Sequence, residues 1–111
     1  MPVSVSPALR GRKLGILLSI APDQPGFAQG LRLAETALNR GVDVYLYCLD
    51  EAVRGAEDPA LLALQARGLK LFACAYAAQR RNLSLTGAAL YSGLGMLSDL
   101  ISATDRFVSF N

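Results

Sequence analysis

Continuous apolar runs along the chain predict buried β-strands. Residues 13–20 (KLGILLSI) are apolar almost without interruption, and residues 42–49 (VDVYLYCL) are rich in β-branched and aromatic side chains. Such runs are typical of strands that are covered on both faces of a sheet. A third run, residues 69–74, ends on Cys74, and a last short strand is expected over residues 105–110.

Apolar residues at helical spacing predict helices in the segments between these strands. One helix is expected to begin near Pro25 and to end at Gly41, and a second to begin at Asp58-Pro59 and to end at Gly68, because capping side chains and prolines favour helix starts and glycine favours helix ends. A third helix is expected near the C-terminus. The apolar stripes are Phe27, Leu31, Ala34 and Leu38 in the first helix and Leu90, Leu94, Leu97 and Ile101 in the last.

The alternation of strands and helices predicts the fold class. We expect a polar loop over residues 50–57, a short helix or turn after Cys74 and a connector over residues 83–87. Short links between alternating elements favour an α/β protein with right-handed crossovers. The expected architecture is one three-layer α/β/α domain over residues 13–111, with a mostly parallel sheet of about five strands. Residues 1–12 are expected to form a flexible tail.

Composition narrows the classes of partner. Hydrophobic residues make up 52% of the 111 residues, and the mean hydropathy is +0.32, which is high for a small monomer and favours a homo-oligomer. The net charge of +2, with both signs mixed along the chain, gives no indication of nucleic-acid binding. No signal peptide and no membrane span are predicted, so a cytoplasmic protein with free thiols is expected.

The residue types exclude several chemistries. The chain has no histidine and two cysteines without a short spacing, which argues against Cys–His catalysis, a zinc site or a CxxC redox pair. Gly93-Leu-Gly95 lies in a helical stripe and not after a strand, so no dinucleotide cofactor is predicted. Asp50 follows the second strand and is interpreted as a turn residue. We therefore expect neither a metal nor a cofactor.

Cys74 is the strongest candidate for chemistry. It is predicted at the carboxyl end of a strand and at the start of a helix, where an open α/β sheet commonly places its functional groups. Amide groups at a helix N-terminus favour a thiolate over a thiol. The residues alone leave a second interpretation open, in which Cys74 is a small packed core residue. Arg80 and Arg81 follow, either as functional cations or as residues that complement the helix dipole.

The segment CAYAAQRR, from Cys74 to Arg81, resembles the cysteine segment of the DsrE/DsrF/TusD-like sulfur-relay family. In that family a cysteine is followed by small residues and then by Arg-Arg-Gly or Arg-Gly. Asn82 stands where the family usually has glycine, so the loop departs from the family pattern, although Asn tolerates the left-handed conformation. The other segments that follow the family's order are residues 13–20, 22–25, 39–41, 42–50 and 93–108.

The resemblance implies a Rossmann-like domain that assembles into trimers or hexamers. It implies that the Cys74 thiolate attacks a donor persulfide, holds the transferred sulfur and passes it to the cysteine of an acceptor protein. Tyr76, Arg80, Arg81 and Asn82 would then bind the substrate or the partner. The family also has members that have lost the cysteine. The sequence names neither donor nor acceptor, and it does not distinguish trimer from hexamer or homo- from hetero-oligomer.

Two other functions remain open from the residues. The chain is alternatively a binding module that holds a small molecule or an anion with Arg80 and Arg81, or a structural subunit with an inert Cys74. Cys48, near the end of the second strand, is either a packed core thiol or a second thiol that resolves the persulfide on Cys74. The sequence does not place the two sulfur atoms within bonding distance.

Overall fold

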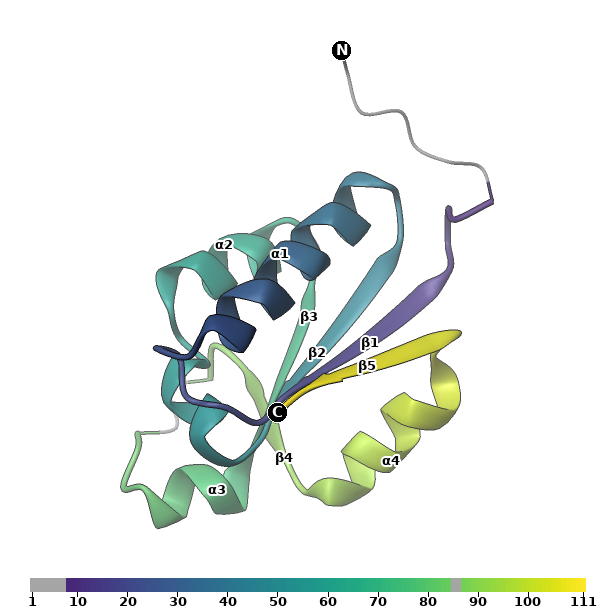
Figure 1. The fold of residues 1–111 in the computed structure, drawn as a ribbon. Helices are drawn as coiled ribbons and strands as arrows, with labels where there is room; N and C mark the ends of the chain where they lie inside the picture. The colour runs from purple at the N-terminus through teal and green to yellow at the C-terminus, as the bar shows by residue number, and fades with distance from the viewer. Residues whose placement is uncertain (1–7, 85–86) are drawn as a thin grey trace.

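Five parallel strands form one sheet in a computed structural model of the chain, which describes residues 8–84 and 87–111 (Figure 1). The strand order is β4-β3-β2-β1-β5, so the first and last strands of the chain lie side by side. Every pair of neighbouring strands is parallel. The elements are β1 (Lys13–Leu18), α1 (Pro25–Asn39), β2 (Asp43–Cys48), the 3₁₀ helix η1 (Asp50–Gly55), α2 (Pro59–Ala66), β3 (Lys70–Cys74), α3 (Ala75–Arg80), β4 (Leu90–Ser92), α4 (Leu94–Ala103) and β5 (Arg106–Phe110).

Helices cover both faces of this sheet. A Cβ atom added to Gly30 of α1 would lie 2.5 Å from Leu18, so α1 packs closely on one face of β1. A Cβ atom added to Gly15 would overlap the ring of Phe107 and lie 3.2 Å from Thr104 at the end of α4. Because Gly15 and Leu18 point to opposite faces of the pleated strand, α1 and α4 lie on opposite sides of the sheet (Figure 1). The predicted α/β domain with a largely parallel sheet of about five strands is therefore confirmed.

The predicted ends of the first two helices are confirmed. Helix α1 begins at Pro25, and Gly41 follows it with a φ of 81°, a left-handed conformation that glycine adopts without strain. Helix α2 begins at Pro59, and the side chain of Asp58 accepts a hydrogen bond of 2.9 Å from the Ala60 amide. These local signals are correct because a cap is made by residues that are adjacent in the sequence.

The C-terminal third differs from the prediction. The stripe that begins at Leu90 was expected to be one helix, but Leu90 belongs to the three-residue strand β4, and α4 begins only at Leu94. The stripe only partly faces the core, since Leu97 packs against it but Leu94 and Ile101 are more than half exposed, and Leu100 outside the stripe is buried. The expected polar loop after β2 contains the 3₁₀ helix η1, with Val53 buried. The predicted connector includes residues 85–86, which lie outside the described residues.

The N-terminal segment is partly described. Residues 1–7 of the predicted tail lie outside the described residues. Residues 8–11 form a turn, in which the Arg12 amide donates to the Leu9 carbonyl at 3.0 Å and the Gly11 amide donates to the Gly41 carbonyl at 3.1 Å. The boundary between tail and domain at residue 12 stays a prediction.

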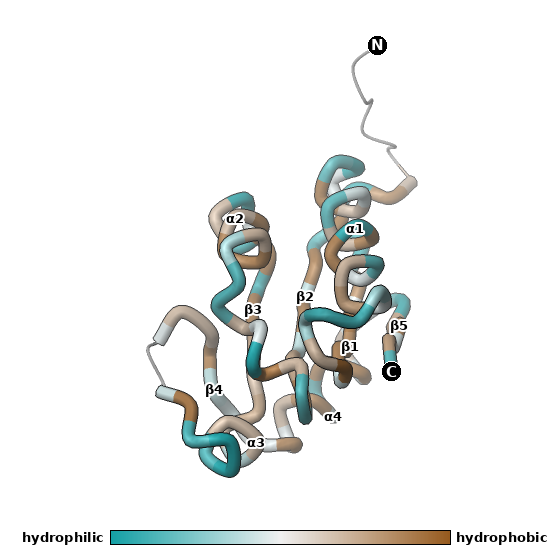
Figure 2. The backbone as a smooth tube through the Cα atoms, turned by 60° about the vertical axis from the view of Figure 1, so that its left-hand side comes forward, coloured by the Kyte–Doolittle hydropathy of each residue, from teal (hydrophilic) through white to brown (hydrophobic). Residues whose placement is uncertain are grey.

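The core is formed by the strands and by the helix faces that cover them. Figure 2 shows apolar segments along the central strands and hydrophilic ones at the end of α3. Ile16, Leu18 and Leu46 are fully buried, and so is Cys48. Burial raises the pKa of the Cys48 thiol to about 12. Cys48 is therefore a neutral core residue in the folded protein at ordinary pH.

Substitution of Gly15 tests the contact between β1 and β5. Gly15→Ala should lower the free energy of unfolding by about 1–3 kcal/mol, because the added methyl group overlaps Phe107 in a packed interior. Gly95→Ala on α4 is the matched control. An added Cβ meets nothing within 4 Å there, so the higher helix propensity of alanine should leave stability equal or raise it. Chemical denaturation measures both, and equal stability of the two variants would contradict the packing.

The buried Cys48 predicts a loss of stability in alkali. Above about pH 8.5 the thiol ionises in the unfolded chain but stays protonated in the folded chain up to about pH 12, so the unfolded state binds fewer protons and stability falls as pH rises. Between about pH 8.5 and about pH 10, the wild-type protein should lose about 1.5 kcal/mol more than the Cys48→Ala variant. Denaturation curves across this range measure the difference, and parallel pH profiles would refute it.

Candidate functional site

Cys74 lies at the junction of β3 and α3. It is the last residue of the strand and the N-cap of the helix, and its Sγ accepts a hydrogen bond of 3.4 Å from the Ala77 amide. Small residues, Ala77 and Ala78, are buried on the inner side of α3 and let the helix pack closely on η1 and β3. The sulfur therefore has one backbone N–H donor beside it, and the residue itself is buried, with 3% of its surface exposed.

A cavity of about 490 Å³ lies beside Cys74 at the carboxyl edge of the sheet. Its walls come from the segments that follow β2, β3 and β4, since parallel strands end at the same edge. The cavity brings together Cys74, Tyr76, Arg80 and Arg81, four of the residues predicted from the sequence. Its lining consists of Leu49, Asp50, Cys74, Tyr76, Ala77, Arg80, Arg81, Gly93 and Leu94.

Arg81 is held in place by η1. Its Nε donates to Glu51 Oε1 at 2.8 Å, and its Nη1 donates to the Ala77 carbonyl at 3.1 Å. Glu51 also accepts from Arg54 at 2.8 Å, and the hydrogen bonds from Arg54 and Arg81 lower the pKa of its carboxyl group. Arg81 therefore folds back toward Cys74 with its charge already balanced in part by Glu51.

Arg80 and Tyr76 form a pair at the exposed rim of the cavity. The Arg80 Nη1 donates to the Tyr76 hydroxyl at 3.0 Å, and the guanidinium carbon lies 5.7 Å from the centre of the tyrosine ring. Tyr76 is 65% exposed. A cation over an aromatic ring at this distance is attracted to the ring face. The pair presents one positive group and one aromatic group to anything that approaches Cys74.

Asn82 does not line this cavity. It lies in the turn after α3 with a φ of 56°. This left-handed conformation is the one expected at a position where the family that the segment resembles has glycine. Its amide donates to the Gln79 carbonyl at 3.1 Å. In the structure Asn82 therefore shapes the turn that carries Arg80 and Arg81, and its part in binding a partner stays a prediction.

Cys48 and Cys74 point to opposite faces of the sheet. Cys48 pairs with Ala73 in the β2–β3 register, so the next residue of β3, Cys74, has its side chain on the other face. Cys48 shares the face of its register partner Leu18, which α1 covers, and both thiols are free. The geometry favours a packed core thiol for Cys48 over a thiol that resolves a persulfide on Cys74.

Tyr47 contributes to the site although the sequence did not single it out. Its hydroxyl donates to the Gly93 carbonyl at 3.1 Å and holds the β4–α4 junction next to Cys74. Burial raises the pKa of Tyr47, and the neighbouring Cys74 adds to this effect, so the hydroxyl stays a neutral donor. The alternation of side chains along β2 shows on which face of the sheet Tyr47 lies. Only the strand order shows that Tyr47 is a neighbour of Cys74, because β2 lies next to β3.

Asp50, Gly93 and Leu94 are further members of the cavity lining that the sequence did not identify as site residues. Asp50 has a φ of 51° and begins η1, so its interpretation as a turn residue is consistent with its backbone. The turn also carries it to the cavity beside Cys74. Gly93 and Leu94 belong to a junction that was expected to be mid-helix, so no local signal could have found them.

The described residues show no other type of site at this edge. In residues 8–84 and 87–111, no group of three or more cysteine, aspartate or glutamate side chains is arranged to hold a metal ion. Of the helices in the same residues, none has the length and apolarity that crossing a membrane requires. The functional groups that line this edge are a thiol, two guanidinium groups, a phenol and the carboxylate of Asp50.

Comparison with known proteins identifies the fold. No protein-family model matches the sequence, and no curated protein matches it. Among solved structures, the ychN protein from E. coli superposes with a TM-score of 0.77 and 19% sequence identity, over 89% of this chain and 99% of that one. At this identity the likeness concerns the backbone arrangement alone. The chain therefore shares the fold of the ychN protein over nearly the whole length of both.

Proposed function

We propose that this protein is a DsrE-like sulfur carrier in which Cys74 accepts sulfur as a persulfide and passes it to a partner thiol. The observation that carries the proposal is the position of the Cys74 sulfur, which receives the Ala77 N–H at 3.4 Å and faces a cavity of about 490 Å³. The segment from Cys74 to Arg81 and the fold shared with the ychN protein support the same conclusion.

The transfer is a thiol–disulfide type exchange at Cys74. Its thiolate attacks the outer sulfur of a donor persulfide, the donor S–S bond breaks, and the electron pair leaves on the donor sulfur as a thiolate. The new persulfide on Cys74 then gives its outer sulfur to an acceptor thiolate by the same step. The proteins that donate and accept sulfur must bring their cysteines to this cavity.

The residues around the sulfur have complementary roles in this proposal. The Ala77 amide donates to the sulfur and orients it, and the Arg80–Tyr76 pair at the rim contacts the incoming protein. Arg81 is bound to Glu51 and so has less charge to offer a free anion. This pairing favours the covalent function over a module that binds an anion through Arg80 and Arg81 together.

Replacement of Cys74 tests the sulfur-carrier function. After exposure to a persulfide donor and removal of excess reagent, the wild-type protein should carry one added sulfur on the peptide that contains Cys74. Cys74→Ser should carry none, because a hydroxyl cannot form a persulfide. Peptide-mapped mass spectrometry measures the addition, and circular dichroism checks the fold.

Cys48→Ala is the matched control for this experiment. It should accept sulfur like the wild type, because Cys48 is buried on the other face of the sheet. Equal sulfur retention by the wild type and the Cys74→Ser variant would rule the proposal out. Loss of sulfur in Cys48→Ala alone would transfer the role to Cys48.

We also propose that the protein is a homo-oligomer that assembles through the outer face of α4. Leu94 and Ile101 lie on one side of this helix and are 58% and 51% exposed, and Leu90 on the neighbouring β4 is 56% exposed. Large apolar side chains that cluster on a surface are typical of interaction sites. Leu94 also lines the cavity at Cys74, so a second copy on this face would border the reactive sulfur.

Charges on this helix face should separate the subunits. The double substitution Leu94→Glu and Ile101→Glu should convert the assembly to monomers, since burial of two carboxylates against apolar side chains is costly. Asp99→Lys is the control, because Asp99 is exposed on the same helix and lies about 150° around the helix axis from the face formed by Leu94 and Ile101. Analytical ultracentrifugation measures the mass, and an unchanged assembly in the double variant would contradict this interface.

A further inference from the structure

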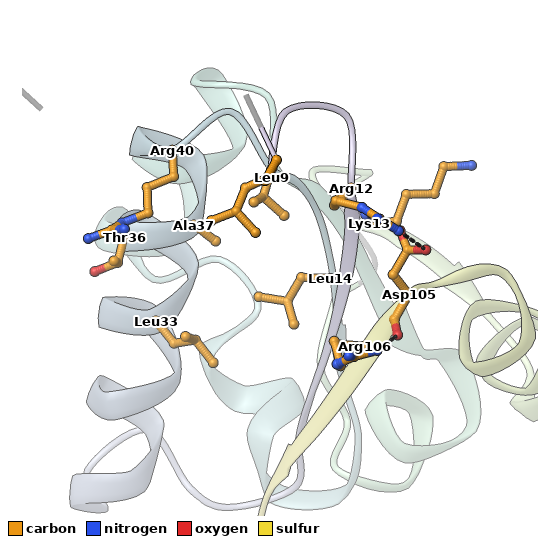
Figure 3. Close-up of a pocket in the computed structure, with 12 residues that line it drawn as sticks. Leu9, Arg12, Lys13, Leu14, Leu33, Thr36, Ala37, Arg40, Asp105 and Arg106 are labelled. Atoms are coloured by element: carbon orange, nitrogen blue, oxygen red, sulfur yellow. Dashed lines mark hydrogen bonds and ion pairs between the residues drawn. The ribbon is translucent and has the colours of Figure 1, made fainter. Parts of the chain in front are cut away.

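A second cavity lies at the opposite end of the sheet from Cys74. It has a volume of about 440 Å³ and opens between α1 and the amino ends of β1 and β5 (Figure 3). Because β1 runs from Lys13 at this cavity to Leu18 at the other edge, the two sites are separated by the full length of the strand. Pockets of this size are typical of small-molecule sites.

The inner surface of the cavity is apolar. Figure 3 shows Leu14 of β1, Leu33 of α1 and Leu9 around one open space. Leu14 and Leu33 are only partly buried although they pack against the core. The sheet and α1 therefore leave apolar side chains in contact with an unfilled space, and an apolar group that entered would remove this surface from water.

The outer wall of the cavity is held by hydrogen bonds. Leu9 belongs to the turn that is tied to the end of α1 by the Gly11–Gly41 bond of 3.1 Å. The Leu9 carbonyl accepts from the Arg12 amide at 3.0 Å. Gly11 and Gly41 have φ values of 77° and 81°, so both ends of this tie use conformations that suit glycine. The wall is therefore a folded part of the domain.

The rim of the cavity has an excess of positive charge. Four cations, Arg12, Lys13, Arg40 and Arg106, and one carboxylate, Asp105, contribute to the lining. Asp105 is already engaged, because it accepts from the Lys13 amide at 2.8 Å and lies 3.5 Å from Arg12. The hydrogen bond from the Lys13 amide is the main cause that lowers the pKa of Asp105, so the carboxylate stays ionised and balances part of the charge of Arg12.

Arg106 is the cation left for a ligand at the inner surface of the cavity. Arg106 pairs with Leu14 in the β1–β5 register, so its side chain lies on the same face of the sheet as the apolar cavity. Its Nη1 donates to the Asp105 backbone carbonyl at 2.9 Å. Within residues 8–84 and 87–111, its guanidinium group has no carboxylate at salt-bridge distance. Figure 3 shows Lys13 and Arg40 extended away from the space around Leu14.

We propose that this cavity binds a small amphiphilic carboxylate, with an apolar chain among Leu9, Leu14 and Leu33 and the carboxylate at Arg106. A saturated chain of about eight to ten carbons suits a cavity of this volume. The guanidinium group of Arg106 supplies the planar donors that a carboxylate accepts. The site uses none of the residues of the Cys74 cavity.

Titration of the full-length protein with sodium decanoate tests the proposal. In ¹⁵N–¹H spectra recorded below the micelle concentration, saturable shifts should appear at the amides of residues 9–14, 33–42 and 105–106. The Arg106→Gln variant should bind about threefold more weakly, since one exposed charged contact contributes modestly. Arg32→Gln is the matched control, because Arg32 is an exposed cation on α1 outside this lining. It should bind like the wild type.

Three outcomes would overturn the proposal. The first is the absence of shifts at these amides, or shifts confined to the exposed α4 face at Leu94 and Ile101. The second is equal weakening by Arg32→Gln, which would indicate general attraction to a basic surface. The third is equal binding of the decyltrimethylammonium cation, which would remove the role of Arg106. Sulfur transfer to Cys74 is measured separately, so failure of one proposal leaves the other intact.

Discussion

The structure depends on covering the central strand β1 on both faces at once. β1 pairs with β2 on one side and with β5 on the other, and its apolar residues alternate between the two faces. A parallel strand in this position is stable only if helices cover both faces of the sheet. Gly30 allows α1 to approach Leu18, and Gly15 allows Phe107 and the end of α4 to approach from the other side. A side chain at either glycine would overlap these neighbours.

The same parallel arrangement determines where chemistry is possible. All five strands end at one edge, so the segments after β2, β3 and β4 meet there and surround Cys74. The pleat separates the two cysteines, because Cys48 and Cys74 occupy positions of opposite parity in the β2–β3 register. Both cysteines are buried, but Cys48 lies under α1 with a pKa raised to about 12, while Cys74 lines the cavity at the carboxyl edge.

The two ends of the sheet have different surface chemistry. At the carboxyl edge, the thiol of Cys74 accepts a hydrogen bond from one backbone amide, and the guanidinium groups of the same cavity already have partners, Glu51 and Tyr76. At the amino edge, apolar side chains line the space, and Arg106 has no carboxylate partner among the described residues. The proposed sulfur-transfer site and the proposed carboxylate site therefore lie at opposite ends of one small domain.

The sequence by itself determined the features that depend on residues adjacent in the chain. The caps at Asp58-Pro59 and Gly41, the three long apolar strands and the position of Cys74 at a strand–helix junction all follow from local patterns. They were predictable because a cap or a buried strand depends on residues that are adjacent in the chain. The likeness of the cysteine segment to a known family was also local.

Only the tertiary structure decided the strand order, the edge strand β4 and the members of the cavity that come from distant segments. Three residues are too few to show a strand period, so Leu90 was read as part of a helix. Tyr47 and Leu94 reach Cys74 only because β2 and β4 flank β3, an order set by packing between elements far apart in the sequence. The sequence predicted that the Cys74 sulfur lies at an edge of the sheet. It did not predict the residues around the sulfur, because contacts between distant segments produce no local sequence pattern.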